Sequence, residues 1–293
     1  MADYVIAGVS GNTGKATAQA LLDGGASVRV VVRDAAKGEA WRARGAEVAV
    51  ADLGDAGALA SALRGARGCY LLVPPNMAAP SFVEYQKRTG QAVVEAVRQA
   101  KVPHVVFLSS VGAELSEGTG PIKGLKPVEE GLRALDGTVS TFLRAAYFME
   151  NLGGSLGMLA QGVLPGFQPT DLAFPMIATR DIGAVAAREL REGARVNSII
   201  ELSAAKSYSL DDAAAALTRL TGREVKAQAF PLEAMVPTLT GFGFPQEIAA
   251  LYQEMTAGFI AGRVRFHGTH RTVHGPTELS TVLQALLANA PKG

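Results

Sequence analysis

The residues that most clearly suggest chemistry are three glycines near the start of the sequence, Gly8, Gly11 and Gly14. They lie between a short apolar run and a helix-like stretch. In such a turn the first glycine permits the bend, the second lets the backbone approach a pyrophosphate, and the third allows close helix packing. The helix that follows offers free N–H groups to the phosphates. The spacing predicts a dinucleotide-binding turn, with a purely structural turn as the alternative. The predicted contacts are Gly8, Ser10, Gly11, Asn12, Thr13 and Gly14.

The end of the second apolar run, 28–32, predicts which dinucleotide binds. An acidic residue there would receive the ribose 2′-OH of NAD, whereas an arginine accommodates the 2′-phosphate of NADP. Arg33 holds this place and Lys37 follows closely, so NADP(H) is favoured. Asp34 could still reach a ribose, which leaves NAD(H) open, and Arg33 could be a solvated loop residue.

Other candidate contacts follow the later apolar runs, because ligands of parallel α/β sheets bind at the carboxyl ends of the strands. Asp52 could receive the adenine edge or cap a helix that begins near Asp55. The full set predicted here is Asp52, Leu53, Val73, Pro74, Pro75 and Ser109.

The elements that must position these residues alternate along the first half of the chain. Short apolar runs, typical of strands buried on both faces, occupy 4–7, 28–32, 47–51, 70–73 and 104–108, with later ones at 140–143 and 198–202. Helix-like stretches fill 14–22, 55–63 and 81–99, the last with Ser81 as N-cap. Asp181 and Ser209 are predicted to cap helices that end near 190 and 220. This alternation predicts an α/β fold, a Rossmann-type doubly wound parallel sheet with a small, mostly helical C-terminal portion.

The predicted domain organisation follows from this pattern. Residues 1–150 form the NAD(P)-binding Rossmann domain, extended by strands around 176–205. Residues 151–175 and 206–293 form a smaller substrate-binding portion. Within it, 151–175 is rich in Gly, Pro, Leu and Met, which indicates loops lining a site, and 230–262 is a helical part interrupted by prolines.

Composition limits the remaining classes of function. Lys plus Arg number 28 and Asp plus Glu 27, a net charge of +1, which argues against nucleic acid or an anionic membrane as partner. No apolar run reaches the ~18 residues of a membrane span, and no targeting segment is recognised, so a cytoplasmic protein is expected. The expected partner is a small aromatic or quinone-like substrate, and a homodimer is left open.

Several other polar residues are assigned structural roles. The spacing of His267, His270 and His274 invites a metal site, but the segment holds no carboxylate and is predicted to be a basic loop, so no metal is expected. The single cysteine, Cys69, is expected to be buried and inert. The Glu129-Glu130 pair is expected on a solvated helix face.

The chain resembles the NmrA-like family, an atypical branch of the short-chain dehydrogenase/reductases. Besides the glycine turn, the matching segments are Arg33-Asp34, 51–53, Ser109-Ser110-x-Gly112, Leu143-Arg144, 148–151, 179–183 and 275–277. The resemblance implies one of two functions. Some members are NADPH-dependent reductases of quinones, azo dyes or triphenylmethane dyes, whereas others bind NADP without turnover as redox sensors that regulate transcription factors. We expect the reductase, with the sensor as the alternative.

The same resemblance indicates where catalytic residues would lie. Typical members of the wider superfamily place a Tyr-x-x-x-Lys pair about 13 residues after a serine. Counting from Ser109, the tyrosine position is Ile122, and only the lysine, Lys126, remains. Lys126 is the predicted catalytic residue, which would hold the nicotinamide ribose or donate a proton, with a helix-surface lysine as the alternative. An electron-poor acceptor needs little general-acid help, so loss of the tyrosine does not exclude hydride transfer.

The acceptor is expected beside the loop after the sixth strand-like run. Tyr147 and Phe148 are predicted to form an aromatic wall there, and Asn151 to be the polar contact. Packing of the two rings in a hydrophobic core is the alternative.

Overall fold

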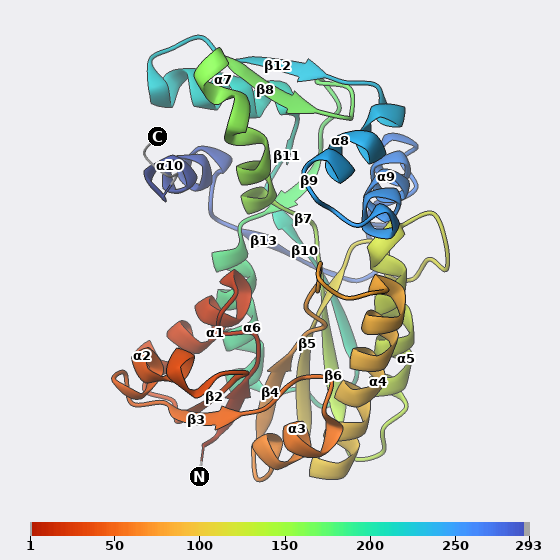
Figure 1. Ribbon diagram of the computed structural model, residues 1–293. Coiled ribbons are helices and arrows are strands. Elements are labelled where there is room, and N and C mark those ends of the chain that lie inside the picture. The colour runs from red at the N-terminus through yellow and green to blue at the C-terminus, as the bar shows by residue number, and fades with distance from the viewer. Residues whose placement is uncertain (1, 290–293) are drawn as a thin grey trace.

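An eight-stranded parallel sheet forms the centre of the protein, as the computed structural model of residues 2–289 shows (Figure 1). Its strand order is β13-β10-β6-β5-β4-β1-β2-β3, with β1 between β2 and β4, so the order reverses there. This arrangement confirms the predicted Rossmann-type doubly wound sheet. The strands are β1 (Tyr4–Ile6), β2 (Val28–Val32), β3 (Glu47–Val50), β4 (Gly68–Leu71), β5 (His104–Ser110), β6 (Val139–Ala145), β10 (Ser198–Ala204) and β13 (Arg271–Gly275).

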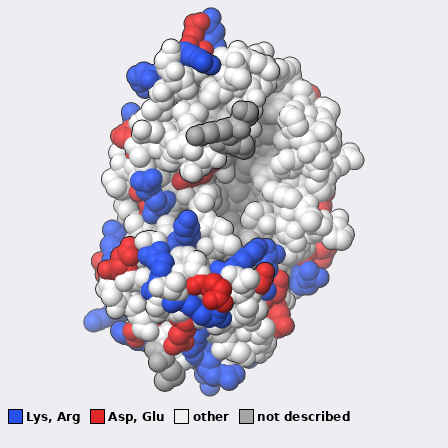
Figure 2. All heavy atoms as spheres, turned by 60° about the vertical axis from the view of Figure 1, so that its left-hand side comes forward, with Lys and Arg blue, Asp and Glu red and all other residues white. Residues whose placement is uncertain are grey.

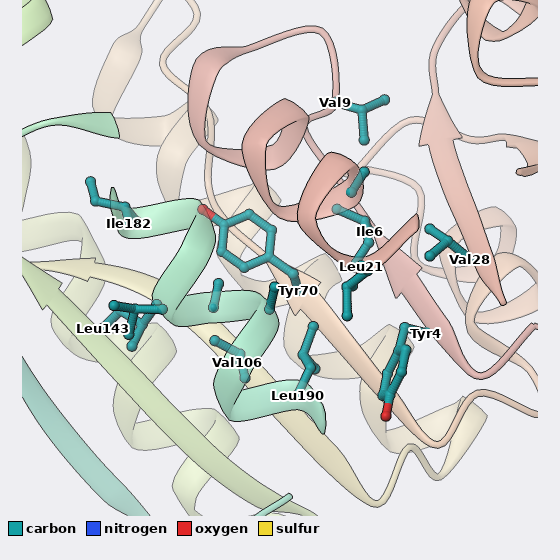
Figure 3. Close-up of a cluster of buried hydrophobic side chains, with 14 of the residues drawn as sticks. Tyr4, Ile6, Val9, Leu21, Val28, Tyr70, Val106, Leu143, Ile182 and Leu190 are labelled. Carbon is teal, nitrogen blue, oxygen red and sulfur yellow. The ribbon is translucent and has the colours of Figure 1, made fainter. Parts of the chain in front are cut away.

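Helices cover both faces of this sheet, which is why its strands are nearly continuous apolar runs. On one face, α1 (Asn12–Asp23) and α6 (Thr179–Glu192) enclose a cluster around the fully buried Tyr70, with Val106 and Leu143 from neighbouring strands (Figure 3). On the other face, the core includes Phe107 and Phe142. The helices there are α3 (Ala56–Leu63), α4 (Phe82–Ala100) and α5 (Lys126–Arg133), and the short α2 (Glu39–Arg42) lies between β2 and β3.

The cap of α6 differs from the prediction. The helix begins at Thr179 with Ala178 at the N-cap position, so Asp181 lies inside the first turn and is buried. Its carboxylate accepts hydrogen bonds from the backbone N–H (2.9 Å) and the hydroxyl (2.7 Å) of Thr277. Asp181 therefore anchors the segment after β13 instead of capping its own helix.

The rest of the chain forms two small sheets and a group of helices beside the main sheet (Figure 1). One sheet joins β11 (Ser207–Tyr208), β9 (Phe174–Ile177) and β7 (Tyr147–Phe148), and the other joins β12 (Lys226–Ala229) to β8 (Val163–Gly166). The prediction of loops over 151–175 was wrong, because this stretch contains most of a 3-10 helix, Met149–Gln161, the strand β8 and the first two residues of β9. The prediction of a basic loop over 267–274 was also wrong in part, because β13 starts at Arg271.

The C-terminal helices are α7 (Leu210–Thr221), α8 (Met235–Gly241), α9 (Gln246–Ile260) and α10 (Leu279–Asn289). Ser209 caps α7 as predicted, in a capping box with Asp212, and Ser81 caps α4. Within residues 2–289, no helix is both long and apolar enough to cross a lipid bilayer.

Candidate functional site

The glycine turn lies between β1 and α1, at the carboxyl edge of the sheet where the strand order reverses. Gly8 has φ +69°, and a Cβ there would lie 2.6 Å from Leu72 Cδ2 in the chain that follows β4. A Cβ on Gly14 would lie 2.4 Å from the carbonyl oxygen of Ala7. A side chain at Gly14 would collide with backbone, and one at Gly8 would be strained by the positive φ and would displace the end of the Leu72 side chain. Both findings agree with the roles predicted for a closely packed helix and a tight turn.

The first turn of α1 faces solvent. Gly11 is its N-cap residue and no side chain accepts a hydrogen bond from the turn, while Ser10, Gly11 and Asn12 are exposed. The N–H groups at this end can therefore donate to an anion, and the helix dipole favours negative charge there. Thr13 is buried, and its carbonyl oxygen accepts the Thr17 hydroxyl (2.9 Å). The backbone donors of the exposed residues Ser10 and Asn12 are therefore groups to which a pyrophosphate could bind.

The residues expected to choose between NADP and NAD follow β2 and are exposed. Asp34 uses its carboxylate to accept the backbone N–H of Ala36 (3.0 Å), so it caps the short 3-10 helix Ala35–Gly38. Arg33 and Lys37 flank this cap on the surface. The local charge at this end of β2 therefore favours a phosphate over an uncharged ribose.

Asp52 is exposed after β3, and its carboxylate accepts the N–H of Gly54 (2.7 Å). Asp55 itself caps α3 by accepting the N–H of Ala58 (3.0 Å), so the capping alternative for Asp52 was wrong. The other predicted contacts at this edge differ in exposure: Leu53 and Val73 are buried, Pro74 is half-buried and Pro75 is exposed.

A buried network of charged groups lies at the end of β5. Ser109 is 3% exposed, and its hydroxyl donates to Glu129 Oε1 at 2.5 Å. Arg144, on β6, donates to both carboxylate oxygens of Glu129 (3.0 and 2.8 Å) and through Nη1 to Glu114 (2.6 Å). Burial lowers the pKa of Arg144, but its carboxylate partners raise it more, so the guanidinium stays charged.

This network corrects one prediction and adds residues that sequence reasoning missed. Glu129 does not face solvent; it is 3% exposed, while its neighbour Glu130 is exposed. An arginine inside a strand with apolar neighbours, Leu143 and Ala145, was the available signal, because a buried guanidinium requires carboxylate partners. Since the hydrogen of Ser109 is donated to Glu129, its oxygen can only accept hydrogen bonds from a ligand.

The lysine of the incomplete motif lies at the start of α5. Lys126 is half-buried, and its Nζ donates to Ser116 Oγ (3.1 Å) in the loop after β5. It therefore reaches towards the carboxyl edge of the sheet and not towards Glu130 of its own helix. Ile122, in the place of the tyrosine, is buried in an apolar cluster.

The two predicted wall residues point into different surroundings. Tyr147 packs edge-on against Phe174 (ring centroids 5.5 Å apart) and Phe259 (6.1 Å). Phe148 packs instead against the core between the sheet and α1, which matches the core-packing alternative. Burial raises the pKa of Tyr147 to about 12, with a further rise from Tyr252 and an opposing effect of a hydrogen bond with Asn151. The structure thus brings Tyr147 and Asn151 together and leaves Phe148 apart.

The three histidines do not converge. His267 lies 3.5 Å from a carboxylate oxygen of Glu114, whereas His274 contacts Ser203 (3.2 Å). Over residues 2–289, no three His, Cys, Asp or Glu side chains are grouped as metal ligands. Cys69 is buried in β4, and burial raises the pKa of its thiol.

Two carboxylates of α9 hold the loops that follow β4 and β5 at the carboxyl edge of the main sheet. Sequence reasoning also missed these two residues. Glu247 accepts the N–H of Phe82 (2.6 Å) and the hydroxyl of Ser81 (3.0 Å), at the start of α4. Glu254 accepts the N–H of Gly118 (2.8 Å) in the loop after β5. Their spacing of seven residues, which puts both on one helix face, was the available signal.

On the face shown in Figure 2, most charged side chains gather over the lower part, with others along the left edge and at the top. The upper right of this face is largely uncharged, and a hollow opens beside it, above the charged lower part.

Several known proteins with similar sequences are reductases. NAD(P)H azoreductase of Xenophilus azovorans is 27% identical over 260 residues, 86% of each chain. Quinone oxidoreductase 2 of Escherichia coli strain K12 is 28% identical over 263 residues, 88% of each chain. The crystal structure of NADPH-dependent quinone oxidoreductase from Escherichia coli, complexed with NADPH, superposes with a TM-score of 0.80 at 25% identity and covers 97% of this chain and 99% of that one.

The similarity extends to a whole protein family. The sequence profile described as "NmrA-like family" matches residues 3–260, which include the glycine turn, the Ser109–Glu129–Arg144 network and α9. The chain therefore belongs to the NmrA-like family.

Proposed function

We propose that this protein is an NADPH-dependent oxidoreductase that transfers a hydride to an aromatic quinone-like or dye-like acceptor. The observation that carries the proposal is the exposed, uncapped start of α1 behind a turn in which Gly8 has a positive φ and Gly14 packs directly on the backbone of the loop after β1. Arg33 and Lys37, exposed after β2, favour NADPH over NADH. The azo and quinone reductases among its relatives support the class of acceptor.

In this proposal NADPH supplies a hydride and becomes NADP⁺. A quinone or azo acceptor takes up that hydride and one proton, whereas a cationic triphenylmethane dye takes up the hydride alone. The N–H groups at the start of α1 hold the pyrophosphate, and Arg33 binds the 2′-phosphate. Tyr147 offers an aromatic surface and Asn151 a polar contact to the acceptor. Lys126 holds the nicotinamide ribose or gives up the proton. Positioning of the acceptor supplies much of the rate.

A second candidate is an NADP-binding redox sensor without turnover. It is favoured by one specific observation: neither Ile122, which is buried and apolar, nor Ser109, whose hydrogen Glu129 receives, can donate a proton to a substrate oxygen. We favour the reductase because an electron-poor quinone or azo group accepts a hydride with little acid assistance.

The experiment that separates the two candidates measures binding and turnover on the same preparation. NADPH and NADH are titrated by nicotinamide fluorescence, and NADPH oxidation is then followed with menadione, an azo dye and a triphenylmethane dye. NADPH binding with turnover of at least one acceptor supports the reductase. NADPH binding without turnover of any acceptor supports the sensor, and absence of dinucleotide binding contradicts both.

A further inference from the structure

A cavity of about 460 Å³ opens on the face of the main sheet beside α5. Its walls come from β6, β10, the last turn of α5, the loop after β5 and the loop that leads into β13. None of the residues assigned above to the dinucleotide or the acceptor lines it. Its volume lies within the range of about 300–1,000 Å³ that is typical of small-molecule sites.

Glu201, on β10, is a buried carboxylate on the floor of this cavity: it is 4% exposed and accepts the N–H of Gly268 (3.2 Å). Arg144 is its neighbour on β6, but each of the three guanidinium nitrogens donates to Glu129 or Glu114. Over residues 2–289, Glu201 forms no ion pair of its own. Because buried charges are normally paired, a cation of the ligand would complete this floor at Glu201.

The mouth of the cavity carries the opposite charge. Arg265, His267 and His270 are exposed there, together with Arg133, whose side chain is 48% exposed and lies over the Phe142 ring. Arg133 also pairs with Glu129 (3.8 Å) and His267 lies 3.5 Å from Glu114, which leaves Arg265 and His270 as the positive groups without an ion pair among the described residues. These groups repel a ligand that bears only positive charge and attract one that also bears a carboxylate.

Two apolar side chains complete the wall, Ile199 from β10 and Phe266 from the loop before β13. They offer contact to a short hydrocarbon chain between the two charged ends of a ligand.

From this arrangement we propose that the cavity binds a small zwitterion, an amino acid or a close analogue. Its ammonium group pairs with Glu201 at the floor, and its carboxylate faces Arg265 and Arg133 at the mouth. The cavity shares Glu114 and Arg144 with the network that holds Ser109, so NADPH binding is measured beside zwitterion binding to show which of the two proposals fails.

The test is a calorimetric titration with four probes of equal chain length. Norvaline and 5-aminopentanoate are isomeric zwitterions with different charge separations, whereas pentylamine and pentanoate each carry one of the charges. We expect one zwitterion to bind at least about tenfold more tightly than either singly charged probe, because only it satisfies both ends of the cavity. The isomer that binds gives the charge separation that the cavity prefers.

Two variants test the assigned contacts. Glu201→Gln should lower the affinity for the zwitterion about tenfold or more. Glu224 is an exposed acid outside the cavity, so Glu224→Gln should leave this affinity unchanged. If Glu201→Gln lowers the thermal unfolding temperature, the exposed Arg265→Ala tests the other end, with a loss of about fivefold expected at an unchanged unfolding temperature.

Three outcomes would overturn the proposal. Neither zwitterion binds, or pentanoate binds as tightly as the zwitterions, or pentylamine binds as tightly as the zwitterions. NADPH is titrated in parallel on each variant. Unchanged NADPH binding by Glu201→Gln assigns a lost zwitterion signal to the cavity and not to the dinucleotide site.

Discussion

The hydroxyl of Ser109 and the carboxylate of Glu129 lie 2.5 Å apart, although 20 residues separate them in the sequence. The contact joins the end of β5 to the first turns of α5, and Arg144 ties the same carboxylate to β6. Ser109, from which the spacing of the incomplete motif is counted, thus directs its hydroxyl into the protein. The network instead fixes the ends of two central strands next to the carboxyl edge where the dinucleotide is proposed to bind.

Glu129→Gln is expected to lower the free energy of unfolding by about 3 kcal/mol. The substitution removes the buried negative charge that compensates Arg144 and leaves the guanidinium with Glu114 as its carboxylate partner. Urea unfolding of the native protein and the variant measures the effect. Glu130→Gln, exposed on the same helix, is the matched control and should change the value by no more than about 0.5 kcal/mol. Equal losses in the two variants would contradict the structural role of Glu129.

Arg33→Ala is expected to raise the dissociation constant of NADPH about tenfold or more while changing that of NADH little. The physical reason is the loss of a charged partner for the 2′-phosphate, which NADH lacks. Fluorescence titration of both dinucleotides gives the ratio directly. Arg67→Ala is the control, because Arg67 is exposed just before β4, at the opposite end of the strands. A native protein that binds both dinucleotides equally would contradict NADPH preference.

The sheet could be predicted from the sequence because its strands are short apolar runs with clear breaks between them. β2 lies where the run at 28–32 places it, and Ser209 caps α7 because its signal is local. β13 could not be predicted in this way. It is the edge strand, and Arg271, Thr272 and His274 are exposed on it, so no apolar run marks it.

The candidate site could be predicted only as far as its signals are local. The glycine turn could be predicted, because its signal is the spacing of three glycines that are close together in the sequence. Glu129 could not, since its burial depends on Arg144, which another strand supplies. The prediction of Asp181 as a helix cap failed for the same reason. Its true partner, Thr277, lies 96 residues further along the chain and leaves no local signal.

The pH dependence of stability should show the buried His104. Burial lowers the pKa of His104, opposed in part by Glu189, and its ring lies 3.1 Å from the Thr141 hydroxyl. Because the native pKa lies below the unfolded value of about 6.5, the contribution to stability is complete above that pH and is lost as the pH falls towards the native pKa. Unfolding free energies measured from about pH 7.5 to about pH 5 should therefore fall towards acid.

His104→Gln should make that pH dependence flatter over the same range, because the group that takes up the proton is gone. His270→Gln, an exposed histidine, should leave the dependence as it is in the native protein. A steeper or unchanged slope in His104→Gln would show that other groups control stability in this range.

Lys126 decides whether the incomplete catalytic motif still has a function. Its Nζ reaches the loop after β5 and contacts Ser116, so the lysine lies towards the proposed nicotinamide side of α5.

Lys126→Ala should weaken NADPH binding or lower kcat about tenfold or more, and Lys126→Arg separates the two roles. The arginine keeps a charged donor for the ribose but cannot release a proton, so restored binding with low kcat identifies a proton donor, and full restoration identifies a binding residue. The control is Lys123→Ala, because Lys123 pairs with Glu254 of α9 and lies outside the motif. Unchanged binding and turnover in both alanine variants would make Lys126 a surface residue and the spacing of the motif a coincidence.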